Sequence, residues 1–206
     1  MRRIGLFGGS FNPPHLGHLH LAEVLQDTLE LDKVFLIPAK KPPHKSDKAY
    51  AAAEDRLRMC QLMSEVHDWL DVSDFELHQE QVSYTYYTAK YFTETYPEDK
   101  FFLLVGSDML TSFTEWFRWQ DILQMVSLAC IAREQDEYEK LIPFAENLRQ
   151  TGEIYLVNAE IFTVSSTKIR DMLGKNQNCS CYLSQKIVKY IREKNLYTGS
   201  DAECIR

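Results

Sequence analysis

Short apolar runs alternate with longer segments of helical periodicity along the whole chain, and this alternation constrains the fold more than any other feature. The apolar runs have the length of buried strands, and most of them precede a segment whose apolar residues recur at helical spacing. We predict strands at 2–7, 33–37, 70–73, 101–105, 127–132 and 153–157, and helices at 17–31, 49–66, 84–95, 113–125, 136–150, 165–173 and 183–194. This order predicts an α/β fold in which a mostly parallel sheet lies between two layers of helices.

The composition is that of an ordinary globular protein, with 45% hydrophobic and 26% charged residues in a chain of 206. We expect a single domain over 1–197 and a flexible tail over 198–206. The formal net charge of −7 argues against a non-specific nucleic-acid binder, which needs a basic face. A small anionic substrate remains compatible with this charge, because a pocket on an acidic protein can be locally positive.

The cysteines indicate the compartment in which the chain works. They fit no common zinc-binding spacing and are Cys60, Cys130, Cys179, Cys181 and Cys204. The sequence contains no apolar run long enough for a signal peptide or a membrane span. We therefore expect a cytoplasmic protein with reduced thiols and no membrane partner.

A glycine-rich turn follows the first predicted strand, where ligands bind in parallel sheets. It comprises Gly8, Gly9, Ser10, Phe11, Asn12, Pro13, Pro14, His15, Leu16, Gly17 and His18. The glycines let the backbone approach a ligand, and the following helix offers N–H groups and positive partial charge to an anion. His15 and His18 are three positions apart, so both imidazoles can face one ligand. The competing interpretations are a plain helix entry with surface histidines, and a zinc site that no nearby Cys or carboxylate completes.

A second candidate phosphate site lies about 150 residues downstream, at the start of another predicted helix. Ser165, Ser166 and Thr167 begin that helix, and Arg170 follows about one turn later. Hydroxyls, helix-start N–H groups and a guanidinium together form a cradle for an anion. The alternative is an ordinary capped helix with a surface arginine.

Together these motifs resemble the nucleotidyltransferase superfamily with HxGH motifs, and more narrowly the bacterial nicotinate-nucleotide adenylyltransferases. Val164 to Arg170 resembles the family's ISSTxIR, with Val in place of the first Ile. The resemblance covers nearly the whole chain and implies a Rossmann-like nucleotidyltransferase fold. It implies transfer of AMP from ATP to the 5′-phosphate of nicotinate mononucleotide, with Mg²⁺ accompanying ATP and no metal ligands from the protein.

The resemblance also assigns residues to ATP. It implies catalytic roles for His15, His18 and Arg170. The implied ATP-binding residues are Gly8, Gly9, Ser10, Phe11, His15, His18, Gly106, Asp108, Ser165, Ser166, Thr167 and Arg170. Within this set, Asp108 matches the family's GxD and suits a ribose hydroxyl, whereas a simple N-cap is the alternative.

Three further segments resemble the parts of the family that hold the mononucleotide, and they supply Lys41, His44, Lys45, Thr85 and Trp116. The lysines and His44 belong to a loop suited to a phosphate, Thr85 follows Ser83-Tyr84 at a helix start, and Trp116 would stack on the pyridine ring. A solvated loop, a helix cap and a core tryptophan are the respective alternatives.

Arg133 would contact phosphate where the family often has Arg-Pro-Gly. Here Glu134 and Gln135 follow Arg133, so this loop is expected to have a different shape.

Other functions remain open. Adenylyltransferases for nicotinamide mononucleotide or phosphopantetheine share the first motif, and a non-catalytic nucleotide sensor would retain both phosphate motifs. A class I aminoacyl-tRNA synthetase fragment is a further alternative, since His15-Leu16-Gly17-His18 resembles HIGH, but the chain lacks a KMSKS-like loop. The expected partners are ATP and nicotinate mononucleotide rather than nucleic acid, and the sequence leaves the oligomeric state open, homo-oligomers included.

Overall fold

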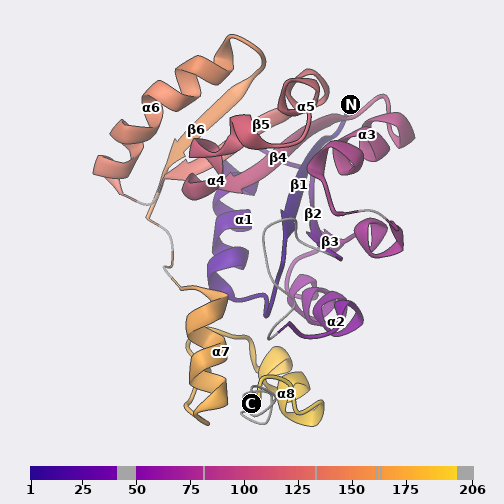
Figure 1. The fold of residues 1–206 in the computed structure, drawn as a ribbon, viewed down its shortest axis with the longest axis vertical. Helices are drawn as coiled ribbons and strands as arrows, with labels where there is room; N and C mark the ends of the chain where they lie inside the picture. The colour runs from indigo at the N-terminus through magenta and orange to yellow at the C-terminus, as the bar shows by residue number, and fades with distance from the viewer. Residues whose placement is uncertain (41–49, 81, 133, 161, 163, 199–206) are drawn as a thin grey trace.

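A six-stranded parallel sheet forms the centre of the computed structural model, which describes residues 1–40, 50–80, 82–132, 134–160, 162 and 164–198 (Figure 1). The strand order is β3-β2-β1-β4-β5-β6, and every neighbouring pair is parallel. The strands are β1 (Arg3–Gly9), β2 (Lys33–Pro38), β3 (Leu70–Val72), β4 (Lys100–Gly106), β5 (Ser127–Ala132) and β6 (Ile154–Asn158). The α/β fold predicted from the sequence is therefore confirmed, and the order reverses between β1 and β4.

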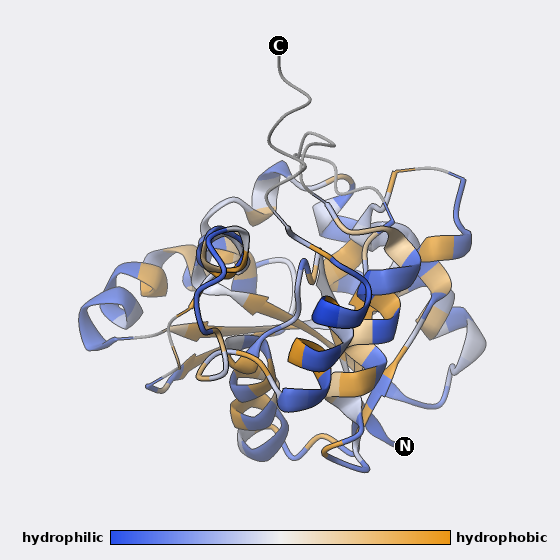
Figure 2. Cartoon of the chain, turned by 90° about the horizontal axis from the view of Figure 1, so that it is seen from below, coloured by the Kyte–Doolittle hydropathy of each residue, from blue (hydrophilic) through white to orange (hydrophobic). Residues whose placement is uncertain are grey.

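Helices cover both faces of the sheet and produce two apolar cores. The helices are α1 (Leu16–Thr28), α2 (Ala53–Ser64), α3 (Thr85–Thr95), α4 (Ser107–Thr111), α5 (Trp119–Met125), α6 (Gln135–Arg149), α7 (Ser166–Gly174) and α8 (Gln185–Glu193), with 3₁₀ turns η1 (Phe75–His78) and η2 (Phe113–Glu115). Apolar residues of α1, α2, α7 and α8 pack in one core, and those of α3, α5 and α6 in the other. In Figure 2 the helices carry both hydrophilic and hydrophobic segments, as expected for helices with one buried face.

Neighbouring residues of one strand contribute to opposite cores. Phe101 lies in the core of α3, α5 and α6, whereas Phe102 lies in the core of α1, α2, α7 and α8. Successive side chains of a strand point to opposite faces, so a strand covered on both sides must be apolar throughout. All six residues of β5 are buried for this reason.

The predicted helix over 113–125 is wrong. Phe113–Glu115 is a 3₁₀ turn, and α5 begins only at Trp119. Arg118 between them has a left-handed backbone (φ 56°, ψ 42°), which ends the helical path. Its guanidinium lies 4.2 Å from the ring centre of Tyr86 and pairs with Asp121 at 2.6 Å, and these contacts support a conformation that periodicity does not reveal. The short helix α4 was not predicted either, because its five residues are too few to show a period.

Candidate active site

The carboxyl ends of β1 and β4 define the place where the chain order reverses, and both ends carry glycine. Among the described residues, no atom lies within 4 Å of the position that a Cβ on Gly8 would occupy. A Cβ on Gly106 would lie 3.0 Å from Oδ1 of Asp108, so this exposed carboxylate folds back over the end of β4. Gly106 is itself the N-cap of α4 and Asp108 lies inside the helix, so the simple N-cap alternative for Asp108 is wrong.

The buried side chain of Phe11 packs against the turn. Its side chain is 1% exposed, and its ring centre lies 5.5 Å from that of Phe7 and 5.0 Å from that of His18. The resemblance implied that Phe11 contacts ATP, but the structure places its side chain in the core. The ring packs against the imidazole of His18, so a contact between Phe11 and ATP would have to come from its main chain.

His15 and His18 cap the start of α1 reciprocally. Nδ1 of His15 accepts a hydrogen bond from the main-chain N–H of His18 at 3.3 Å, and Nδ1 of His18 accepts from the N–H of His15 at 3.2 Å. The two rings stack with their centres 3.6 Å apart. Because both Nδ1 atoms act as acceptors, a neutral imidazole at either position carries its proton on Nε2.

His15 is neutral at physiological pH. Its residue is 5% exposed, and burial, which disfavours the imidazolium, lowers its pKa from the ordinary 6.5 to about 4. The Nε2–H group of His15 is therefore a donor that adds no positive charge of its own.

The main-chain N–H groups at the start of α1 are less available than the sequence suggested. Leu16 donates its N–H to the main-chain oxygen of Tyr182 at 2.9 Å, and His18 donates to His15. The expectation of unpaired donors at this helix start is thus only partly fulfilled. The imidazoles themselves replace an external anion as the cap.

The second motif lies directly against this turn, although about 150 residues separate the two. Ser166 donates from Oγ to the main-chain oxygen of Pro13 at 2.9 Å. Arg170 donates from Nη1 to the main-chain oxygen of Asn12 at 2.8 Å and from Nη2 to Oγ1 of Thr167 at 3.2 Å. Figure 1 shows the start of α7 close to the start of α1.

Ser165 is the N-cap of α7, since its Oγ accepts from the N–H of Lys168.

A close backbone approach explains the glycine between the two histidines. A Cβ on Gly17 would lie 2.8 Å from the main-chain oxygen of Phe162, in the segment that leads into α7. The main-chain N–H of Phe162 in turn donates to Nδ1 of His20 at 3.1 Å. Only a residue without a side chain lets these two segments come so close.

Three residues that the sequence analysis did not single out hold the turn in place, namely Asn12, Arg56 and Tyr197. Asn12 is 1% exposed, and its Oδ1 accepts from the N–H of Ala51 at 3.1 Å and from the hydroxyl of Tyr197 at 2.7 Å. Arg56 is 2% exposed and donates from Nη1 to the main-chain oxygens of Ser10 and Ala39 at 2.8 and 2.7 Å. Burial lowers the pKa of Arg56.

For Arg56 a signal was present in the sequence. It precedes Met59, Cys60 and Met63 by three, four and seven positions, which places a charged residue on the buried face of α2. Asn12 lies inside the first motif but has no role predicted from the sequence, and nothing local marks Tyr197.

The residues predicted for the mononucleotide are described in part. Lys41, His44, Lys45 and Arg133 lie outside the described residues. Thr85 begins α3, and the half-buried ring of Trp116 packs on Phe113 with ring centres 5.1 Å apart. Both predicted roles of Trp116, core packing and ligand stacking, are compatible with this partial exposure.

The loop after β2 begins next to the helix start at Thr85. Lys40 donates its main-chain N–H to Oγ of Ser83 at 3.1 Å and its Nζ to the main-chain oxygen of Gln79 at 2.9 Å. Lys40, which immediately precedes the Lys41–Lys45 segment, is therefore bonded to the Ser83-Tyr84-Thr85 segment.

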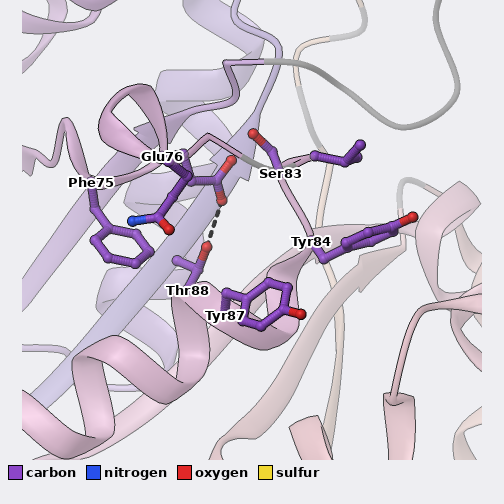
Figure 3. A pocket seen from close by; sticks show the side chains of 8 residues that line it. Phe75, Glu76, Ser83, Tyr84, Tyr87 and Thr88 are labelled. Carbon is purple, nitrogen blue, oxygen red and sulfur yellow. Dashed lines mark hydrogen bonds between the residues drawn. The ribbon is translucent and has the colours of Figure 1, made fainter.

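A small cavity lies beside this contact (Figure 3). Glu76 lines it and is 6% exposed, and its carboxylate accepts a hydrogen bond from Oγ1 of Thr88 at 2.6 Å. Burial raises the pKa of Glu76. The cavity measures about 10 Å³, which is roughly the room that one water molecule needs. At this size it holds a water molecule rather than a pyridine ring.

The described residues offer neither a metal-binding cluster nor a membrane-spanning helix. Within the ranges that the structure describes, no group of three or more His, Cys, Asp and Glu side chains is arranged to hold a metal ion. None of the helices in those ranges has the length and apolarity needed to cross a membrane.

Comparisons with known proteins agree with the geometry. The family model described as cytidylyltransferase-like matches residues 6–172. A probable nicotinate-nucleotide adenylyltransferase of Geobacillus thermodenitrificans is 33% identical over 100% of this chain and 92% of its own length. One from Oceanobacillus iheyensis is 34% identical over 96% of this chain and 97% of its own length.

Solved structures share the fold at lower identity. The Plasmodium falciparum nicotinic acid mononucleotide adenylyltransferase, solved in complex with NaAD, superposes with a TM-score of 0.79 at 20% identity and covers 96% of this chain and 98% of that chain. A putative nicotinate-nucleotide adenylyltransferase from Vibrio parahaemolyticus gives a TM-score of 0.66 at 20% identity, covering 96% of both chains. From the sequence matches and the juxtaposed motifs, the chain belongs to the nicotinate-nucleotide adenylyltransferases of the cytidylyltransferase-like family.

Proposed function

We propose that this chain transfers the adenylyl group of ATP to the 5′-phosphate of nicotinate mononucleotide, giving deamido-NAD and pyrophosphate in NAD biosynthesis. The observation that carries the proposal is the contact between the two phosphate motifs. Ser166 donates to Pro13 and Arg170 donates to Asn12, so the segment that carries the two imidazoles lies against the segment that carries the helix start and the guanidinium. The family membership of the chain supports the same reaction.

The chemistry requires alignment rather than a general base. A phosphate oxygen of the mononucleotide attacks the α-phosphorus of ATP, and the bond from that phosphorus to the bridging oxygen of pyrophosphate breaks. The attacking oxygen is already ionised at neutral pH, so no proton has to be removed. Catalysis then consists of holding two polyanions in line and stabilising the charge that develops between them.

His15 and His18 would supply that stabilisation. Their Nε2–H groups would donate to oxygens of the α- and β-phosphates, with His15 as a neutral imidazole. The stacked rings cap each other at the start of α1, so they are oriented before ATP arrives.

The remaining ATP contacts follow from the positions of the glycines and of α7. Gly8, Gly9 and Ser10 would let ATP lie against the end of β1, and Asp108 beyond Gly106 would bind a ribose hydroxyl. The start of α7 at Ser165, Ser166 and Thr167, together with Arg170, would hold the β- and γ-phosphates. ATP would enter as its Mg²⁺ complex, in which the ion neutralises phosphate charge.

The mononucleotide would bind between the loop after β2 and the start of α3. Thr85 and neighbouring N–H groups would bind the pyridine carboxylate, and Trp116 would stack on the ring. Lys41, His44, Lys45 and Arg133 are proposed for its phosphate on the sequence resemblance alone. We further propose that the reaction takes place in the cytoplasm, where both small substrates are available.

The decisive experiment offers the purified full chain ATP and Mg²⁺ with one acceptor at a time. Nicotinate mononucleotide, nicotinamide mononucleotide and phosphopantetheine are compared, and chromatography follows the adenylylated product while a coupled assay follows pyrophosphate. We expect deamido-NAD to form fastest. Faster product formation from another acceptor would reassign the substrate, and ATP binding without pyrophosphate release would make the chain a nucleotide sensor.

A further inference from the structure

The chain turns back toward the active site after α8 in an unusual backbone conformation. Asn195 and Tyr197 have φ angles of 53° and 61°, in the left-handed region. This region is unfavourable for a bulky residue such as tyrosine and is retained only where surrounding contacts outweigh the strain. The N–H of Leu196 donates to the main-chain oxygen of Ile191 at 3.0 Å, and Leu196 packs against the core of α1, α2, α7 and α8. We call Asn195–Thr198 the C-terminal turn.

The hydroxyl of Tyr197 contacts the first motif. The hydroxyl of Tyr197 lies 2.7 Å from Oδ1 of Asn12, which also accepts from the N–H of Ala51. Because Oδ1 is a carbonyl oxygen, Tyr197 must be the donor and must keep its proton. Burial raises the pKa of Tyr197, which keeps the phenol protonated throughout the physiological range.

Asn12 therefore joins its own turn to three segments that are remote in sequence. Its side chain binds the start of α2 through Ala51 and the C-terminal turn through Tyr197, and its main-chain oxygen binds α7 through Arg170. The next residue, Pro13, accepts the hydroxyl of Ser166. The contacts of Asn12 therefore help to set where the turn that carries His15 lies relative to α7.

We propose that Tyr197 is a positioning residue of the reaction, whose hydroxyl holds Asn12 so that His15, His18 and Arg170 converge on the same phosphates. The inference rests on the proposed adenylyl transfer. Loss of the hydroxyl would let the turn move relative to α7, and small displacements of aligned groups cost rate more than they cost binding. The C-terminal turn is therefore part of the catalytic scaffold, although it contributes no group that touches a substrate.

The test compares two tyrosines that each donate one hydrogen bond. In Tyr197→Phe the ring stays and only the bond to Asn12 is lost. Tyr190→Phe is the matched control, because the hydroxyl of Tyr190, 2.7 Å from Oδ1 of Asp55, donates to a residue of α2 rather than to Asn12. For Tyr197→Phe we expect kcat to fall about tenfold with the KM for each substrate changed by less than about threefold. The control should keep kcat within about twofold. Equal kcat values for the two folded variants would overturn the proposal.

A double-mutant cycle shows whether Tyr197 acts through Asn12. In an Asn12→Ala background, Tyr197→Phe should reduce kcat no further, since the acceptor of its hydroxyl is gone. Additive losses in the double variant would mean that the tyrosine acts by another route, and would overturn the proposal.

Hydrogen exchange separates this inference from the proposed function. Amide exchange in residues 10–18 should be faster in Tyr197→Phe than in wild type and in Tyr190→Phe, whether or not the chain makes deamido-NAD. Wild-type protein without product would refute the proposed function alone. Unchanged exchange in residues 10–18 of Tyr197→Phe would refute the positioning role alone.

Discussion

Arg170 on α7 donates to the main-chain oxygen of Asn12 at 2.8 Å, although 158 residues separate them in the chain. The same guanidinium donates to Oγ1 of Thr167 at 3.2 Å, so it is held from two directions. Asn12 is buried in the turn after β1, whereas α7 follows β6 near the other end of the chain. This planar side chain, together with the bond from Ser166 to Pro13, ties together the two segments that are proposed to hold the phosphates of ATP.

Replacing Arg170 by lysine should therefore not be conservative. A single ammonium cannot reach the oxygen of Asn12 and the hydroxyl of Thr167 in the geometry of the planar fork. We expect Arg170→Lys to lower kcat/KM for ATP by about a hundredfold while the circular dichroism spectrum is unchanged. Lys175→Ala, an exposed change at the other end of α7, is the control and should keep wild-type activity. A fully active Arg170→Lys enzyme would contradict the role.

Removing the imidazole of His18 should slow the chemical step. His18→Ala deletes a donor proposed to act in the transition state, and such losses lower turnover by about 10²–10³. Turnover at saturating substrates is the measurement, with thermal unfolding as the check on folding, because Nδ1 of His18 also caps the N–H of His15. The exposed His78, which pairs with Asp74, provides the control substitution. Near-normal turnover of folded His18→Ala would refute the assignment.

The buried His15 should make stability depend on pH. Its folded pKa of about 4 lies below the ordinary 6.5, so the unfolded chain binds an extra proton between these values and stability falls as the pH drops through this window. The free energy of unfolding should be about 2 kcal/mol lower at pH 5 than at pH 7.5 from this group. Asparagine is a good N-cap that does not titrate, so His15→Asn should lose this part of the pH dependence. Urea unfolding at both pH values tests it, and identical pH dependence in both proteins would contradict it.

Two glycines of the first motif should respond differently to alanine. In Gly17→Ala the new Cβ meets the main-chain oxygen of Phe162 at 2.8 Å, and we expect a destabilisation of about 1–3 kcal/mol. In Gly8→Ala the Cβ enters open space, so stability should change by less than about 0.5 kcal/mol, whereas ATP should bind more weakly. Chemical unfolding and titration with a non-hydrolysable ATP analogue measure the two effects. Equal stability losses would show that the close approach at Gly17 is unimportant.

Trp116 should affect one substrate more than the other. If its half-buried ring stacks on the pyridine, Trp116→Ala should raise the KM for nicotinate mononucleotide by about tenfold or more, and the KM for ATP by much less. Trp119→Ala is the matched control, since Trp119 packs partly buried against the same core. Equal changes in both KM values for Trp116→Ala would assign this ring to the core.

Much of the fold follows from the sequence because its signals are local. The apolar run of β5 marks a strand covered on both faces, and the predicted bounds 127–132 agree with the observed Ser127–Ala132. The helix starts at Leu16 and Ser166 lie within one residue of the predicted ones, since the residues before them cap helices. The prediction of one helix over 113–125 is wrong because the helical path is interrupted at Arg118. The left-handed backbone of Arg118 is supported by Tyr86 from α3.

The sequence by itself determined which residues are proposed for the phosphate chemistry, since both motifs and their order can be read from residue types and spacing. Only the tertiary structure decided how they are held: Tyr197 and Arg170 bind Asn12, Arg56 binds Ser10 and Ala39, and Gly17 lies against Phe162. The physical reason is the range of the interactions. Strand and helix formation depend on neighbours within a few positions, whereas hydrogen bonds between segments up to 185 residues apart exist only once the chain has folded and excluded water from them.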